Sequence, residues 1–220
     1  MQQLARRAVA EALGTALLIV AVIGSGIMAT RLTDDVAIQL LANSIATGGA
    51  LMALILMFSS VSGAQFNPAV SITAGLLREL AWREVGVFVG AQVVGGCLGA
   101  IAANVMFELN VVNLSHHDRS SAALWFSEAL ATFGLLLVIN GIVRSNRATV
   151  VAFAVAAWIT GAYWFTSSTS FANPAVTVAR MLSDTFAGIA PASAPMFIVM
   201  QLIAVAAAVP VIRLLWPHAD

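Results

Sequence analysis

The chain carries one short motif twice, as SGAQFNPAV at residues 62–70 and as FANPAV at residues 171–176. In each copy the asparagine, Asn67 or Asn173, is a favoured helix N-cap, because its side-chain oxygen accepts a hydrogen bond from the first turn. The following Pro68 or Pro174 suits the first helical position, where no hydrogen bond is lost. Each copy therefore predicts a helix start that presents the donors of a fixed side-chain amide.

The helices that these motifs open, at 67–78 and 173–183, are too short to cross a bilayer of about 30 Å. They follow loops rich in glycine or serine, which membranes tolerate only where the loop is buried in protein or lines a cavity. Around them the chain is 60% hydrophobic and 9% charged, against about 25% charged in a soluble domain. Six apolar stretches are long enough to span a membrane: 5–29, 36–58, 83–107, 122–143, 149–166 and 195–215.

The two halves of the chain repeat one another in the same order of landmarks. Glu11 in the first span matches Glu128 in the fourth, the two Asn-Pro-Ala-Val motifs match, and Gln92 in the third span matches Gln201 in the sixth. Three spans per half is an odd number, so the second half must enter the membrane from the opposite side. We predict an all-α membrane protein, with six transmembrane helices and two re-entrant half-helices in an inverted 3+3 repeat. It forms one domain over 1–220, with repeats at about 1–110 and 120–220.

Arginine placement predicts the orientation, since the chain has ten arginines and no lysine. Cytoplasmic loops carry an excess of positive charge. The predicted topology places seven arginines on one side of the membrane: Arg6, Arg7, Arg78, Arg83, Arg144, Arg147 and Arg213. It places three on the other side: Arg31, Arg119 and Arg180. We therefore expect both termini in the cytoplasm and the protein in the cell inner (plasma) membrane. The apolar run from Ala8 to about Met28 is long enough to span, so we expect it to stay as a helix and not to be cleaved as a signal peptide.

These features together resemble the aquaporin, or major intrinsic protein, family. The resemblance rests on both Asn-Pro-Ala motifs, the glutamates of spans one and four, the glutamines of spans three and six, and the inverted repeat. It implies a passive channel for water and small neutral solutes, assembled as a homotetramer with one pore per subunit. Two half-helix N-termini meeting at mid-membrane would offer amide donors and positive dipole ends to a solute, and would repel cations and protons.

The resemblance also implies a role for Glu11 and Glu128, which are costly charges deep in spans. In the family such glutamates accept hydrogen bonds from backbone N–H groups of the Asn-Pro-Ala loops. A proton-relay pair is the alternative.

Four positions of the family's outer constriction carry over by spacing to Thr47, Gly161, Ser170 and Val176. Most family members have an arginine where this chain has Val176, so a fixed charge with several donors is missing. We expect a wider, less polar ring that passes polyols, urea-like molecules or neutral metalloid hydroxides such as arsenous acid, as in a bacterial aquaglyceroporin-like branch linked to arsenic handling. Arg180 shares a helical face with Asn173 and Val176. It is either a charge of the outer vestibule or an arginine extended to the lipid headgroups.

Other residue patterns predict no further chemistry. Net charge is zero, which gives no reason to expect a nucleic-acid partner. The adjacent His116 and His117 lack zinc-site spacing, and no catalytic arrangement stands out, so we expect no enzyme activity, metal or cofactor. Glycines at a spacing of four, Gly86/Gly90 and Gly95/Gly99, predict close helix packing. A secondary transporter with inverted repeats and broken helices is the main alternative function, and a junctional membrane protein is a weaker one.

Overall fold

The computed structural model describes residues 2–217, in which every regular element is helical. Six candidate membrane spans are long and apolar enough to cross a bilayer. They are α1 (Gln2–Leu32), α2 (Val36–Ser62), α4 (Trp82–Met106), α5 (Ala122–Arg144), α6 (Val151–Phe165) with the short 3₁₀ turn η1 (Ala148–Val150) before it, and α8 (Ala194–Leu215). Two short helices, α3 (Pro68–Leu76) and α7 (Pro174–Arg180), separate the spans. The predicted fold class is confirmed.

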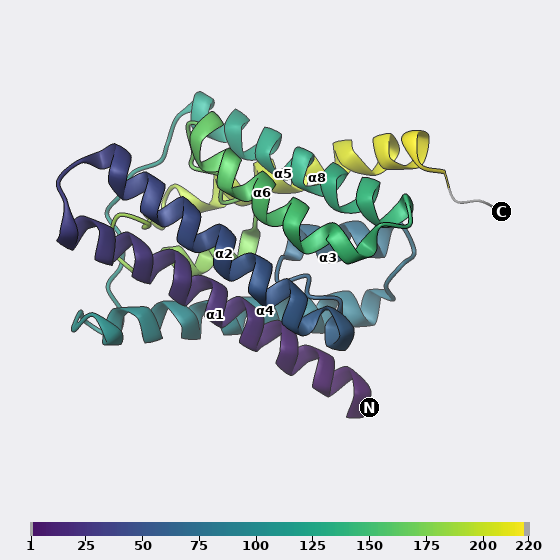
Figure 1. The fold of residues 1–220 in the computed structure, drawn as a ribbon, viewed down its shortest axis with the longest axis horizontal. Helices are drawn as coiled ribbons and strands as arrows, with labels where there is room; N and C mark the ends of the chain where they lie inside the picture. Colours follow the sequence, from purple (N-terminus) through teal and green to yellow (C-terminus); the bar gives the residue numbers. More distant parts are fainter. Residues whose placement is uncertain (1, 218–220) are drawn as a thin grey trace.

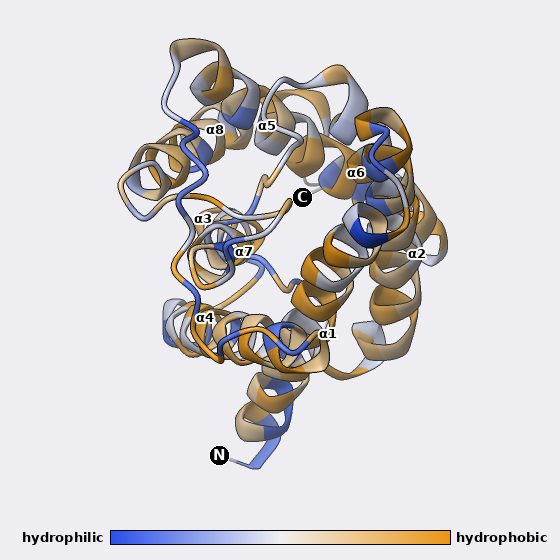
Figure 2. Cartoon of the chain, turned by 90° about the vertical axis from the view of Figure 1, so that its left-hand side faces the viewer, coloured by the Kyte–Doolittle hydropathy of each residue, from blue (hydrophilic) through white to orange (hydrophobic). Residues whose placement is uncertain are grey.

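The long helices lie side by side, and α1 begins at the end of the bundle where α8 ends (Figure 1). Seen from the opposite end, they surround α3 and α7, which lie inside the ring (Figure 2). The closest packing joins α1 to α4 and α2, α5 to α8, and α2 to α6, while α3 and α7 contact each other. In each half a long helix pair is followed by a short helix and a further long one, so the order of elements repeats.

The half-helices end slightly earlier than the sequence predicts. In α3 the helix stops because Arg78 adopts a left-handed backbone conformation (φ +64°), and the N–H of Glu79 returns to the carbonyl of Ala74 at 2.8 Å. In α7 the N–H of Leu182 bonds to the carbonyl of Ala179 at 3.0 Å in a tighter turn. Both short helices therefore stop within three turns, and neither could cross a bilayer.

The predicted close packing of glycines is correct for one pair and wrong for the other within this subunit. A Cβ at Gly95 or Gly99 would lie 2.1 Å from the carbonyl oxygen of Ala12 or 2.3 Å from that of Ala16, so α1 and α4 touch backbone to backbone. A Cβ at Gly86 or Gly90 would meet no atom within 4 Å. The reason is the helix face, because Gly86 and Gly90 lie on the exposed side of α4.

Candidate pore

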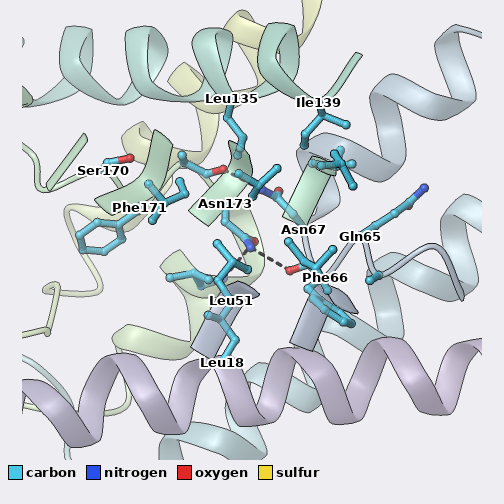
Figure 3. A pocket seen from close by; sticks show the side chains of 18 of the residues that line it. Leu18, Leu51, Gln65, Phe66, Asn67, Leu135, Ile139, Ser170, Phe171 and Asn173 are labelled. Atoms are coloured by element: carbon cyan, nitrogen blue, oxygen red, sulfur yellow. Dashed lines mark hydrogen bonds between the residues drawn. The ribbon is translucent and has the colours of Figure 1, made fainter. Parts of the chain in front are cut away.

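Asn67 and Asn173 lie side by side in the middle of the bundle, where each caps its own half-helix and bonds to the other loop. The Oδ1 of Asn67 accepts from the N–H of Ala69 at 2.9 Å, and its Nδ2 donates to the carbonyl of Ala172 at 2.8 Å. The Oδ1 of Asn173 accepts from Ala175 at 2.9 Å, and its Nδ2 donates to the carbonyl of Phe66 at 2.8 Å (Figure 3). Each side-chain amide has two N–H donors and uses one of them in the hydrogen bond to the other loop, so one donor per asparagine remains for a solute.

Glu11 of α1 holds the loop before Asn67 through four hydrogen bonds. Its Oε1 accepts from the hydroxyl of Ser62 at 2.5 Å and the N–H of Gln65 at 3.0 Å. Its Oε2 accepts from the N–H of Phe66 at 2.6 Å and the Nε2 of Gln92 at 2.8 Å. The side chain is fully buried. A carboxylate surrounded by four donors is an acceptor, which is the arrangement expected of a loop brace.

Glu128 of α5 makes the same set of contacts in the second half. Its Oε1 accepts from the hydroxyl of Ser168 at 2.6 Å and the N–H of Phe171 at 2.9 Å. Its Oε2 accepts from the N–H of Ala172 at 2.9 Å and the Nε2 of Gln201 at 2.7 Å. All four donors are again N–H or O–H groups of neighbouring segments. The geometry therefore gives the proton-relay alternative no support, since within residues 2–217 neither glutamate forms an ion pair with another side chain.

The two loops that carry the asparagines are backbone-strained in the same way. Ala64 and Phe66 have φ values of +50° and +50°, and Ser170 and Ala172, at the same distances from the second asparagine, have +52° and +49°. A residue with a side chain in this left-handed region costs about 1–3 kcal/mol and persists only where its surroundings enforce it. The buried glutamates supply that enforcement, because they bond to N–H groups of the strained segments.

A cavity of about 250 Å³ passes beside both asparagines. Its wall includes Arg180 as well as Glu79 and Asn140, and Glu79 lies at the end of the bundle where α8 ends, since Arg144 bonds to both Glu79 and the carbonyl of Trp216. The remaining lining residues are mostly apolar: Leu18, Val22, Thr47, Leu51, Ile55, Gly63, Ala64, Gln65, Phe66, Asn67, Val70, Ala74, Leu135, Ile139, Val143, Val151, Val155, Ile159, Tyr163, Ser170, Phe171, Ala172, Asn173 and Val176. The cavity therefore has an apolar wall interrupted by a few polar groups.

Three of the four residues predicted for the constriction line this cavity, namely Thr47, Ser170 and Val176. The hydroxyl of Thr47 lies 3.2 Å from that of Tyr163, which the sequence analysis missed. The hydroxyl of Ser170 is buried and has no protein hydrogen-bond partner within residues 2–217. Val176 is 5% exposed, and its N–H is occupied by Asn173. The outer part of the cavity therefore has hydroxyl groups but no charge at position 176.

Gly161 does not line the cavity, so its predicted place in the constriction is wrong. The lining residues of α6 are Val151, Val155, Ile159 and Tyr163, which recur every four residues along one helix face. Gly161 lies two residues from Tyr163, on the opposite side of the helix, and a Cβ there would contact only the ring of Phe165. Counting residues back from Asn173 selects Gly161, but it does not consider which face of the helix lines the cavity. The four-residue period of the lining residues identifies Tyr163 instead.

Arg180 lines the cavity and is buried, with 2% of its surface exposed. Its Nε donates to the carbonyl of Ala187, and its Cζ lies 3.4 Å from the centre of the Phe171 ring. An arginine held in this way cannot reach lipid headgroups, so that alternative is wrong. Arg119 also lies over Phe171, at 5.1 Å, and its Nε donates to Gly188 at 2.9 Å. Neither Phe171 nor Arg119 stood out in the sequence.

His116 and His117 belong to no cluster of three or more potential metal ligands in the part of the chain that the structure describes. The Nδ1 of His116 lies 3.0 Å from the Oδ2 of Asp184, and the backbone N–H of His116 donates to the same carboxylate at 2.9 Å. The pKa of His117 is lowered by its partial burial and by the positive charges of Arg119 and Arg180. These contacts join the loop before α5 to the segment after α7.

Two Asn-capped half-helices that meet inside a ring of six apolar helices, beside a cavity, define a membrane channel with an inverted repeat. Comparison with known proteins identifies the family. A family model described as "Major intrinsic protein" matches residues 1–150. The chain is 47% identical over 210 residues to "Aquaglyceroporin AqpS" of Rhizobium meliloti (strain 1021), which covers 96% of this chain and 90% of that protein. The chain therefore belongs to the major intrinsic protein family.

More distant relatives agree with this assignment. The chain is 30% identical over 149 residues to "Probable aquaporin NIP4-2" of Arabidopsis thaliana, which covers 66% of this chain and 52% of that longer protein. The X-ray structure of the aquaglyceroporin from Plasmodium falciparum shares the fold, with a TM-score of 0.64 at 19% identity over 96% of this chain and 99% of that one. Membership makes this multi-pass membrane protein a channel for water and small neutral solutes, and not an enzyme.

Proposed function

We propose that this channel passes neutral solutes larger than water by passive diffusion and excludes protons and ions. The solutes are glycerol, urea-like molecules and neutral metalloid hydroxides such as arsenous acid. The observation that carries the proposal is the outer part of the cavity, where Val176 stands in place of the family's usual arginine beside Thr47 and Ser170. A valine is shorter than an arginine and leaves more room for a solute.

The polar groups along the cavity suit hydroxyl-bearing solutes. The unpartnered hydroxyl of Ser170 and the remaining amide donors of Asn67 and Asn173 can replace hydrogen bonds that a solute loses on leaving water. Apolar side chains such as Leu135 and Ile139 also line the cavity and would contact the apolar part of the same solute (Figure 3). This combination favours small neutral molecules with both polar and apolar surface.

Proton and cation exclusion at the midplane follows from the half-helices. The N-termini of α3 and α7 each contribute about half a unit of positive charge, and both N-caps lie at the cavity wall. A cation at this point faces positive charge, and each asparagine offers it a donor where it needs an acceptor. A neutral oxygen acceptor is stabilised at the same place.

The decisive variant is Val176→Arg, with Val176→Leu as a matched control that adds size without charge. Purified proteins in liposomes are compared by stopped-flow light scattering for water, glycerol, urea and arsenous acid. We expect Val176→Arg to lower flux of the larger solutes about tenfold, a barrier increase of about 1.4 kcal/mol, while water flux partly remains. Unchanged glycerol and urea flux in Val176→Arg would remove Val176 from the constriction.

The secondary-transporter alternative differs in kinetics. A transporter also uses broken helices at the midplane, but its flux saturates and depends on a coupling ion. A channel gives glycerol flux that rises linearly with concentration, has a weak temperature dependence and is indifferent to sodium or proton gradients. Saturation at millimolar glycerol together with gradient dependence would favour the transporter.

The assembly and placement are also part of the proposal. We propose a homotetramer with one pore per subunit, in the cell inner (plasma) membrane, with both termini cytoplasmic and residues 1–220 acting as one channel domain. The uneven distribution of arginines supports the orientation, and family membership supports the tetramer. Accessibility of single cysteines placed near Gln2 and in the α1–α2 loop tests the orientation, and mass measurement of the protein–detergent complex tests the tetramer.

A further inference from the structure

Arg180 lies one helical turn beyond Val176 on the cavity side of α7, at the outer end of the passage. Its guanidinium lies over the ring of Phe171, and its Nε donates to the carbonyl of Ala187. We infer that Arg180 is the cation-excluding residue of the outer mouth, and that it supplies from one turn further out the charge that position 176 lacks.

The protein holds this guanidinium in place without neutralising it. Its Nε donates to the carbonyl of Ala187, and its Cζ lies 3.4 Å from the centre of the Phe171 ring. Phe171 is fixed in turn by an edge contact with Phe197, at 5.2 Å between ring centres and 71° between planes. The Nε contact is the one hydrogen bond that the Arg180 side chain makes with protein atoms of residues 2–217. The two terminal nitrogens are therefore left for the cavity that the side chain lines.

The charge of Arg180 forms no ion pair in the described part of the chain. No carboxylate within residues 2–217 lies within ion-pair distance of it. Glu128, a carboxylate whose charge acts on Arg180, has both oxygens occupied by loop and side-chain donors. Arg119 adds a second buried positive charge nearby, but its nitrogens donate to backbone carbonyls and it does not line the cavity. Arginine stays protonated at any physiological pH, so the outer mouth carries a permanent positive charge.

An arginine at position 176 would both narrow the passage and repel cations. In this chain the two tasks fall to different residues, with Val176 at the constriction and the positive charge on Arg180. With Val176 at the constriction, room is left for a larger solute, while the charge stands outside that point. A cation coming from outside meets Arg180 in a partly buried site, where repulsion between like charges is much stronger than in water. A neutral solute feels no such repulsion and finds N–H donors instead. The inference rests on the proposed function only in that both use the same cavity.

Urea and guanidinium test the inference, because they are planar molecules of nearly the same size and differ by one charge. The variants are Arg180→Gln and Arg180→Met, with Arg180→Lys as the charge-keeping form. Arg31→Gln is the matched control, since Arg31 is an exposed outer arginine that bonds to the carbonyl of Phe107 at 2.6 Å and does not line the cavity. Each protein is reconstituted in liposomes, and water, urea and guanidinium fluxes are measured on the same preparation.

In the unaltered channel we expect urea to pass and guanidinium to stay at the level of protein-free liposomes. In Arg180→Gln and Arg180→Met guanidinium flux should rise about tenfold or more, because the repelling charge is gone, with urea flux changed less than about twofold. Arg180→Lys and Arg31→Gln should keep the exclusion. Water flux identifies the variants that fold, and either neutral variant suffices.

Two results would overturn the inference. The first is a folded neutral variant that conducts water and still excludes guanidinium, which would leave exclusion to the midplane. The second is an equal rise of urea and guanidinium, which would make Arg180 a steric obstacle. A failure of the proposed function is a different observation, since it would show as urea and glycerol excluded by the unaltered channel. Guanidinium entry into Arg180→Gln in that case would still support the charge role.

Discussion

Replacing Glu11 by glutamine should cost stability that can be worked out from its four hydrogen bonds. A glutamine has one acceptor oxygen where glutamate has two, so one pair of donors loses its partner whichever way the amide is turned. The pair is either Phe66 N–H and Gln92 Nε2, or Ser62 Oγ and Gln65 N–H. A hydrogen bond to a charged group contributes about 1.5–3 kcal/mol. Two such losses amount to about 3–6 kcal/mol.

The same substitution should also lower flux. Phe66 has a strained backbone, and its carbonyl accepts the hydrogen bond of Asn173. If the N–H of Phe66 is no longer held by Glu11, the loop can relax toward an ordinary conformation and shift the partner of Asn173. We therefore expect water flux through Glu11→Gln to fall, because the two half-helix N-termini lose their fixed spacing at the cavity.

Unfolding in mixed detergent micelles and stopped-flow water flux measure the two effects. Glu84→Gln is the control, since Glu84 pairs with Arg7 in a partly exposed position, where an ion pair contributes about 0–1 kcal/mol. Glu128→Gln should match Glu11→Gln, because its four contacts are equivalent. A loss in Glu11→Gln no greater than that in Glu84→Gln, with full water flux, would refute the reasoning.

Two further predictions concern close contacts of glycine. Gly99→Ala should destabilise the α1–α4 pair by about 1–3 kcal/mol, because its Cβ would lie 2.3 Å from the carbonyl oxygen of Ala16. Gly90→Ala is the control and should unfold like the unaltered protein, because a Cβ there would meet no atom within 4 Å. Equal stability of the two variants would contradict the packing. Gly14→Ala should lower water flux, because its Cβ would lie 2.0 Å from the Phe66 ring. Adding Phe66→Ala should restore part of that flux, and a double variant worse than both single ones would exclude a steric cause.

The sequence was sufficient to predict the spans and the half-helices for physical reasons that are local. Hydropathy and length mark a bilayer span, and an Asn-Pro pair marks a helix start. The matched positions of Glu11 and Glu128 also predicted that these two buried glutamates are equivalent residues of the two repeats. Their serine partners were missed, although Ser62 and Ser168 both lie five residues before an Asn-Pro motif. Comparing the two repeats position by position would have found them.

The outer end of the pore was harder to predict because it depends on helix phase and on loops. The spacing that selected Gly161 counts residues through the loop between α6 and Asn173, so it is insensitive to which side of α6 faces the cavity. Tyr163 takes that face instead. The position of the Arg180 side chain depends on contacts with the Phe171 ring and the carbonyl of Ala187. Both of these residues lie in segments without regular secondary structure. No local pattern encodes such a contact.

The two repeats are alike where the solute meets the asparagines and differ where a charge is needed. Val70 and Val176 occupy the same position relative to the two asparagines, and both line the cavity. One turn further along the half-helices the equivalents are Ala74 and Arg180, which also both line it. The valines therefore line the cavity symmetrically about the two asparagines, whereas the arginine stands on one side. The role that we infer for Arg180 needs only one arginine, because repulsion acts on a cation as soon as it enters the mouth. In this proposal the two valine positions set the width of the passage.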